Sequence, residues 1–106
     1  MQIAMIGLGK MGLNMARRLA RGRHSLVLYD RSQEQAVEAA KEMRGAKAAT
    51  SLEEVVGFLR PPRIVWLMIP AGKPVDDTID QLETLLGRKD LVIEGGNSFY
   101  KDDIRH

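Results

Sequence analysis

Three glycines near the N-terminus have the spacing of a phosphate-binding turn. Gly7, Gly9 and Gly12 form the pattern Gly-x-Gly-x-x-Gly. In such a turn the first glycine allows a sharp bend, the second lets a pyrophosphate approach the backbone, and the third brings the following helix close to the sheet. The complete turn consists of Gly7, Leu8, Gly9, Lys10, Met11 and Gly12. A helix that starts here offers unpaired N–H groups and the positive end of its dipole to the phosphates. The turn therefore predicts a dinucleotide site, and a tight turn that binds nothing is the alternative.

An acidic residue follows at a distance that suits the ribose of such a dinucleotide. Asp30 lies 18 positions after Gly12, close to the expected spacing of about 20. Its carboxylate could accept hydrogen bonds from the adenosine ribose and would repel a 2′-phosphate, which favours NAD over NADP. Arg31 could instead pair with a 2′-phosphate or stack on adenine. The alternative for 30–32 is a simple turn in which Ser32 caps a helix.

Two further segments are expected at the same ligand site. Ile69, Pro70 and Ala71 follow one apolar run, and Asn97 follows another. Ligands of open α/β sheets bind beyond the carboxyl ends of the strands, so both segments should line one cleft. The Asn97 amide can donate and accept hydrogen bonds. Its alternative role is a helix cap.

No complete hydride-transfer site is evident. Oxidation of a substrate alcohol needs a general base near the nicotinamide, usually His or Lys. His24 precedes a strand and His106 is the last residue, while Lys10 and Lys73 fit surface or phosphate-adjacent positions. We therefore expect no catalytic residue within this chain.

The elements that must position these residues alternate between strand and helix. We expect strands at 3–6, 26–29, 47–49, 64–69 and 91–93, and helices at 11–21, 33–44, 52–59 and 74–86. Such alternation predicts a Rossmann-type, doubly wound parallel sheet with helices on both faces. Asn97 or Ser98 could start another helix near Tyr100. Residues 1–106 are thus expected to form one dinucleotide-binding domain, truncated before its last strands and belonging to a longer protein.

Composition restricts the other possibilities. The formal net charge is only +2, and the cluster Arg17, Arg18, Arg21 and Arg23 is interpreted as a solvated helix face, so we expect no nucleic-acid partner. The chain has no cysteine, which excludes disulfides and thiolate metal sites and is compatible with the cytoplasm. No apolar run approaches the roughly 20 residues of a membrane span. We expect no metal and no membrane contact.

Longer stretches of sequence resemble a known family. Residues 5–19 resemble the β-hydroxyacid dehydrogenase superfamily. Residues 62–76, with Pro70-Ala71-Gly72, and residues 93–105, with Gly95-Gly96-Asn97-Ser98, are similar to the N-terminal coenzyme domain of the decarboxylating 6-phosphogluconate dehydrogenase family. The resemblance implies oxidation and decarboxylation of 6-phosphogluconate to ribulose 5-phosphate in the pentose phosphate pathway.

The resemblance also assigns roles to residues. It implies that 7–12 hold the pyrophosphate, 30–32 meet the adenosine ribose, 69–71 pass near the nicotinamide, and Asn97 touches both coenzyme and substrate. NADP-using members have Asn where this chain has Asp30, so the resemblance is to the shorter, NAD-preferring branch. Pro70 stands in place of a common lysine, and Glu94 in place of a common aspartate. The family's catalytic lysine and glutamate are expected beyond residue 106, in a helical domain that completes the substrate site and a homo-oligomer.

Two alternatives stay open. One is another β-hydroxyacid dehydrogenase, such as a 3-hydroxyisobutyrate enzyme, which shares the glycine turn. The other is a non-catalytic regulatory module that senses NAD, which would share the glycines and Asp30 but would not need Asn97.

Overall fold

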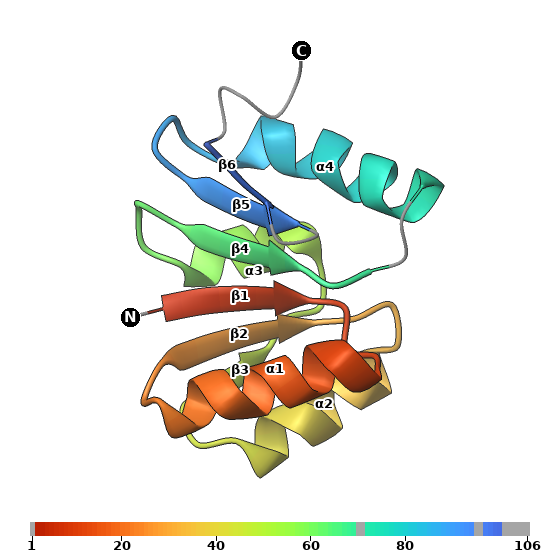
Figure 1. Cartoon of the computed structure of the whole chain (residues 1–106), viewed down its shortest axis with the longest axis vertical. Helices are drawn as coiled ribbons and strands as arrows, with labels where there is room; N and C mark the ends of the chain where they lie inside the picture. Colours follow the sequence, from red (N-terminus) through yellow and green to blue (C-terminus); the bar gives the residue numbers. More distant parts are fainter. Residues whose placement is uncertain (1, 70–71, 95–96, 101–106) are drawn as a thin grey trace.

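The chain folds around one six-stranded sheet. The computed structural model describes residues 2–69, 72–94 and 97–100, without the side chains of residues 97–99. The strand order is β3-β2-β1-β4-β5-β6 (Figure 1). The strands are β1 (Gln2–Ile6), β2 (Ser25–Tyr29), β3 (Ala46–Ala48), β4 (Ile64–Leu67), β5 (Leu91–Glu94) and β6 (Asn97–Tyr100). The helices are α1 (Lys10–Arg21), α2 (Gln33–Glu42), α3 (Leu52–Phe58) and α4 (Lys73–Leu85).

The first five strands are parallel, and the helices cover both faces of the sheet. The apolar sides of α1 and α2 pack on one face, and those of α3 and α4 pack on the other (Figure 1). This confirms the predicted doubly wound architecture. The strand β1 lies between β2 and β4, so the connections leave it toward opposite sides of the sheet. Ligands of such sheets bind at this point, beyond the carboxyl ends of the strands.

The end of the described chain differs from the prediction. Residues Asn97–Tyr100 form an antiparallel strand on β5, with Glu94 opposite Asn97, rather than the start of a helix. Only two residues, both glycine in the sequence, separate the paired positions. Two strands joined by Gly-Gly are a recognised signature of a hairpin. That signal was present in the sequence, and the helix expected near Tyr100 was wrong for these residues.

Serine hydroxyls cap the starts of α2 and α3. The hydroxyl of Ser32 accepts a hydrogen bond from the N–H of Gln35 at 3.3 Å and caps α2. The hydroxyl of Ser51 does the same for Glu54 at 3.1 Å and caps α3. The Glu54 carboxylate reaches back past Ser51 and accepts a hydrogen bond from the N–H of Thr50 at 2.7 Å, whereas a standard capping box would use the N–H of the cap residue itself.

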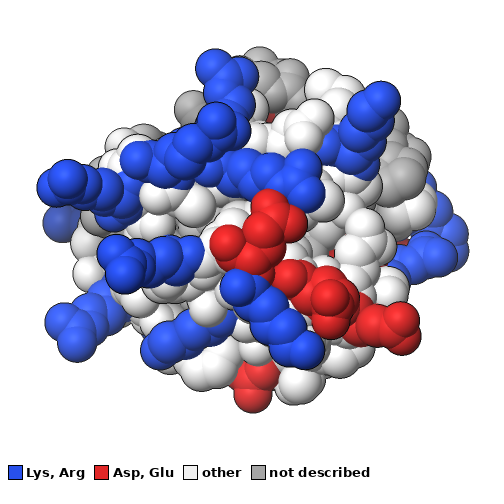
Figure 2. Space-filling view, turned by 90° about the horizontal axis from the view of Figure 1, so that it is seen from below, with Lys and Arg blue, Asp and Glu red and all other residues white. Residues whose placement is uncertain are grey.

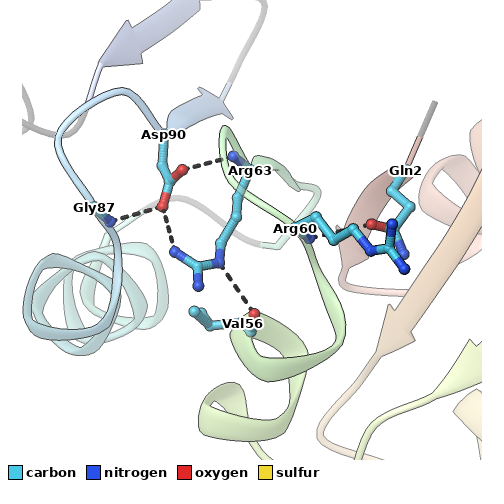
Figure 3. A network of polar contacts seen from close by, with 6 residues as sticks. All are labelled: Gln2, Val56, Arg60, Arg63, Gly87 and Asp90. Carbon is cyan, nitrogen blue, oxygen red and sulfur yellow. Dashed lines mark hydrogen bonds and ion pairs between the residues drawn. The ribbon is translucent and has the colours of Figure 1, made fainter.

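A partly buried ion pair joins the starts of β4 and β5, at the end of the sheet opposite to the carboxyl ends (Figure 3). Asp90 is only 1% exposed. Its carboxylate accepts hydrogen bonds from the backbone N–H of Arg63 at 2.6 Å, from the N–H of Gly87 at 2.7 Å and from the Arg63 guanidinium at 3.0 Å. The same guanidinium also donates to the carbonyl of Val56 in α3 at 3.1 Å. Gly87, which follows the end of α4, thus ties that helix to the start of β5.

The hydrogen bonds decide the charge state of Asp90. Burial alone would raise the pKa of the carboxyl, but the donors from Arg63 and Gly87 together lower the pKa below its ordinary value. The ionised form therefore stabilises the fold above the ordinary pKa. That contribution is lost as the pH falls through the lowered pKa.

We predict that Asp90→Asn lowers the free energy of unfolding near neutral pH by about 2 to 4 kcal/mol, because the partly buried Arg63 guanidinium loses its counter-charge. The loss should begin to shrink below about pH 4, where the Asp90 carboxyl of the unfolded wild type takes up a proton, and it should disappear only below the lowered pKa of the folded protein. Urea denaturation at a series of pH values measures this. Glu34→Gln, an exposed acid on α2, is the control and should show little change. A stability difference independent of pH would contradict the assignment.

Candidate functional site

A cleft of about 790 Å³ opens at the carboxyl ends of the central strands. It lies where β1, β2 and β4 end, and α4 forms one of its walls. Of the residues predicted from the sequence, it brings together Gly7, Gly9, Asp30, Arg31 and Ile69. The cleft therefore lies at the position where an open α/β sheet is expected to bind its ligand.

The three glycines of the turn have different structural roles. Gly7 has a φ of +98°, and a Cβ there would collide with the carbonyl oxygen of Met68. A Cβ at Gly12 would collide with the carbonyl oxygen of Gly7 and lie 3.2 Å from the Cβ of Met68. Both observations confirm the predicted reasons for glycine, a tight turn and a close helix. Gly9 has an ordinary φ of −66°, and a Cβ there would meet no described atom within 4 Å.

The space beside Gly9 is therefore open toward the cleft that Gly9 lines. Packing within the described part of the chain does not require a glycine at this position. A side chain there would instead occupy room that a ligand could use. The shape of the turn thus fits a group that approaches the backbone closely, which is how a pyrophosphate is bound at such turns.

The other residues of the turn face different environments. Leu8 is fully buried in the core under α1 and α2. Lys10 and Met11 are exposed in the first turn of α1, and Met11 is 74% exposed although it continues the line of Met15 and Leu19. Within the described residues, α1 has no side-chain cap and no acidic residue in its first turn. Its first N–H groups and the positive end of its dipole are therefore available to an anion.

Asp30 connects the end of β2 to the glycine turn. One carboxylate oxygen accepts a hydrogen bond from the N–H of Leu8 at 2.6 Å, and the other accepts from the N–H of Ser32 at 2.9 Å. Each oxygen keeps capacity for a further donor such as a hydroxyl. Ser32, predicted near the ribose, uses its own hydroxyl to cap α2, while Arg31 is exposed and lines the cleft.

The helix α4 forms a wall of the cleft that was not predicted from the sequence. Lys73, Asp77, Thr78 and Gln81 line the cleft from this helix. Lys73 pairs with Asp77 at 3.3 Å, and the Thr78 hydroxyl donates to the carbonyl of Pro74 at 2.8 Å. Lys73, Asp77 and Gln81 are four positions apart in the sequence, so they lie on one side of α4. Lys73 was expected at the surface, and it is both exposed and part of this wall.

Some predicted site residues cannot be placed in the cleft. Pro70 and Ala71 lie outside the described residues, as does the side chain of Asn97, whose backbone belongs to β6. His24 lies before the start of β2, at the opposite end of that strand from Asp30. Over the described ranges, no group of three or more His, Asp or Glu side chains could hold a metal ion.

The basic residues of α1 lie on a mixed surface. Arg17 forms an ion pair with Glu42 of α2 at 2.5 Å, and this hydrogen bond lowers the pKa of Glu42. Lys41 pairs with Glu38 at 3.5 Å. Figure 2 shows Lys and Arg side chains spread over this end of the molecule, with Asp and Glu side chains between them. None of the helices in residues 2–69 and 72–94 has the length and apolarity needed to cross a membrane.

Comparison with known proteins agrees with the geometry. A sequence model of the NAD binding domain of 6-phosphogluconate dehydrogenase matches residues 2–106. The NAD(+)-dependent, decarboxylating 6-phosphogluconate dehydrogenase of Haloferax volcanii is 41% identical over 105 residues, covering 99% of this chain and 34% of that protein. The chain thus spans about a third of the length of this curated relative.

Two solved structures are similar. Plasmodium falciparum 6-phosphogluconate dehydrogenase, studied with its cofactor NADP+ and with 6-phosphogluconate, has a TM-score of 0.80 at 29% identity, covering 96% of this chain and 23% of that one. Mycobacterium tuberculosis 3-hydroxyisobutyrate dehydrogenase has a TM-score of 0.76 at 27% identity, covering 88% of this chain and 30% of that one.

We predict that the same substitution destabilises the fold at one glycine of the turn and leaves its stability nearly unchanged at another. Gly12→Ser should lower the free energy of unfolding by about 1 to 3 kcal/mol, because the new side chain collides with the Gly7 carbonyl. Gly9→Ser should change it by less than about 0.5 kcal/mol, because Ser is a preferred N-cap and the space is open. Denaturant unfolding of both variants measures this. Equal losses would show that Gly9 also serves packing.

Proposed function

This chain belongs to the family of NAD-binding domains of 6-phosphogluconate dehydrogenase, and from that membership we propose that it binds NAD in the cleft beside the glycine turn. The observation that carries the proposal is the open space at Gly9, next to uncapped N–H groups at the start of α1. A pyrophosphate placed there would accept hydrogen bonds from the backbone and interact favourably with the helix dipole. Residues 7–12 would form this part of the site.

The adenosine half would extend along the end of β2. The carboxylate of Asp30 lines the cleft, and its oxygens have capacity for the ribose hydroxyls. A 2′-phosphate in the same place would meet this negative charge at close range, which supports NAD rather than NADP. Arg31 and Ser32 would flank the ribose, with Ser32 acting mainly through the cap of α2.

The nicotinamide half would extend toward the end of β4. Ile69 lines the cleft on that side, and Pro70 and Ala71 directly follow it in the sequence. When bound, NAD supplies the acceptor for a hydride from the substrate. The role of these residues is to hold the ring in place, and Asn97 is proposed to contact both the coenzyme and the substrate.

For the whole protein we propose the oxidation and decarboxylation of 6-phosphogluconate to ribulose 5-phosphate. The support is the 41% identity to a decarboxylating, NAD(+)-dependent relative. Among the solved structures, the 6-phosphogluconate dehydrogenase has a TM-score of 0.80 and the 3-hydroxyisobutyrate dehydrogenase one of 0.76, at 29% and 27% identity. The proposal includes a homo-oligomer, a general base supplied by residues outside 1–106, and a cytoplasmic location, because the substrate and the coenzyme are soluble metabolites.

We predict that this chain binds NAD roughly tenfold or more tightly than NADP, because a 2′-phosphate would face the Asp30 carboxylate. Asp30→Asn should narrow that gap. It should also weaken NAD binding, because an amide offers one oxygen where Leu8 and Ser32 each require an acceptor. Calorimetric titration of both coenzymes into both proteins measures this.

The matched control is Asp76→Asn, the same change of charge on α4 at an exposed residue outside the cleft lining. It should leave the NAD to NADP ratio unchanged. Tighter binding of NADP than of NAD to the unmodified chain would contradict the coenzyme assignment, and binding of neither would contradict the proposed site.

A further inference from the structure

Leu8 is held through both polar groups of its backbone. Its N–H donates to Asp30 at 2.6 Å, and its carbonyl accepts from the side-chain amide of Gln35 at 2.6 Å. Asp30 follows β2, and Gln35 lies in the first turn of α2. The segment after β2 therefore fixes the turn after β1, although the two are separated by more than 20 residues in the chain. The sequence pattern showed neither contact.

These contacts close into a ring. The N–H of Gln35 donates to the hydroxyl of Ser32 at 3.3 Å, and the N–H of Ser32 donates to Asp30 at 2.9 Å. Leu8, Asp30, Ser32 and Gln35 are thus joined by four successive hydrogen bonds. Because the cap fixes the backbone of Gln35 and the buried side chain of Leu8 anchors the turn, the Gln35 amide holds the Leu8 carbonyl in one direction.

The direction of that carbonyl determines where the next N–H points. The carbonyl of Leu8 and the N–H of Gly9 belong to one planar trans peptide, so they point in opposite directions. Gln35 holds the carbonyl toward α2, and the N–H of Gly9 consequently points away from α2. The helices α2 and α4 pack on opposite faces of the sheet, and the cleft that Gly9 lines is bounded by α4. The N–H of Gly9 is thereby turned toward the side of the cleft.

We propose that Gln35 is a positioning residue for the pyrophosphate: its side-chain amide orients the Leu8–Gly9 peptide so that the Gly9 N–H faces the phosphates. This inference rests on the proposed function, since it requires a dinucleotide in the cleft. Gln35 is not among the residues that line the cleft. It acts through the carbonyl of Leu8 and not by touching the coenzyme.

Three substitutions distinguish the positioning of the Gly9 N–H by the Gln35 amide from a nonspecific effect of changing a residue on α2. Gln35→Met keeps the length of the side chain and removes the donor, whereas Gln35→Lys supplies a donor again. Gln33→Met makes the same chemical change at an exposed neighbour in the same helical turn. In calorimetric titrations, Gln35→Met should weaken NAD binding roughly three- to tenfold, the effect of one hydrogen bond. Gln35→Lys and Gln33→Met should stay within about twofold of the wild type.

Two further readouts distinguish positioning from loss of structure. Adenosine, which has no phosphate, should bind Gln35→Met within about twofold of the wild type, because only the phosphate contact is disturbed. Without ligand, the amide hydrogen of Leu8 should exchange faster in Gln35→Met because the ring is open, while the urea midpoint stays close to that of the wild type.

The results distinguish a failure of the Gln35 proposal from a failure of the proposed NAD binding. Unchanged NAD affinity in Gln35→Met, an equal loss of adenosine binding, or failure of Gln35→Lys to restore affinity would overturn this proposal while leaving the proposed function intact. No binding of NAD to the wild-type chain would overturn both.

Discussion

The N–H and C=O groups of the turn between β1 and α1 are needed both by the fold and by a ligand in the cleft. Each group points in one direction, so a group that is hydrogen-bonded within the protein does not face the ligand. The N–H of Gly7 continues the ladder to the carbonyl of Tyr29 at 2.8 Å, and the two polar groups of Leu8 are bound by Asp30 and Gln35. The fold thus uses the first part of the turn. The N–H groups from Gly9 onward, at the start of α1, remain for the cleft.

The two ends of the sheet have different roles. The amino ends of β4 and β5 carry the ion pair of Arg63 and Asp90, which links both strands to α3. The carboxyl ends of β1, β2 and β4 carry the cleft, with backbone groups and half-exposed side chains. The ion pair and the cleft therefore lie at opposite ends of the strands. Substitutions at Asp90 and at Gly9 can accordingly be studied independently.

The sequence allowed much of the fold to be predicted, because each signal was local. Apolar runs, the cap at Ser32 and the glycine spacing depend on neighbouring residues, and they led to the correct order of strands and helices through β5. The antiparallel β6 was missed because Asn97 and Ser98 were interpreted as helix caps instead of the hairpin partner of β5. The hydrogen bond from Gln35 to Leu8 and the contribution of Lys73 and Asp77 to the cleft could not be predicted, because they depend on which elements the fold brings together.

The central claim, that the phosphates of NAD lie against the N–H groups at the start of α1, is tested most directly by nuclear magnetic resonance. NAD is titrated into the ¹⁵N-labelled chain, and the backbone amide signals are followed. The account predicts the largest shifts at Gly9, Lys10 and Met11, with downfield movement of their amide protons as they donate to phosphate. Saturable binding of NAD with these three signals unmoved, and the largest shifts at residues remote from the turn, would contradict it.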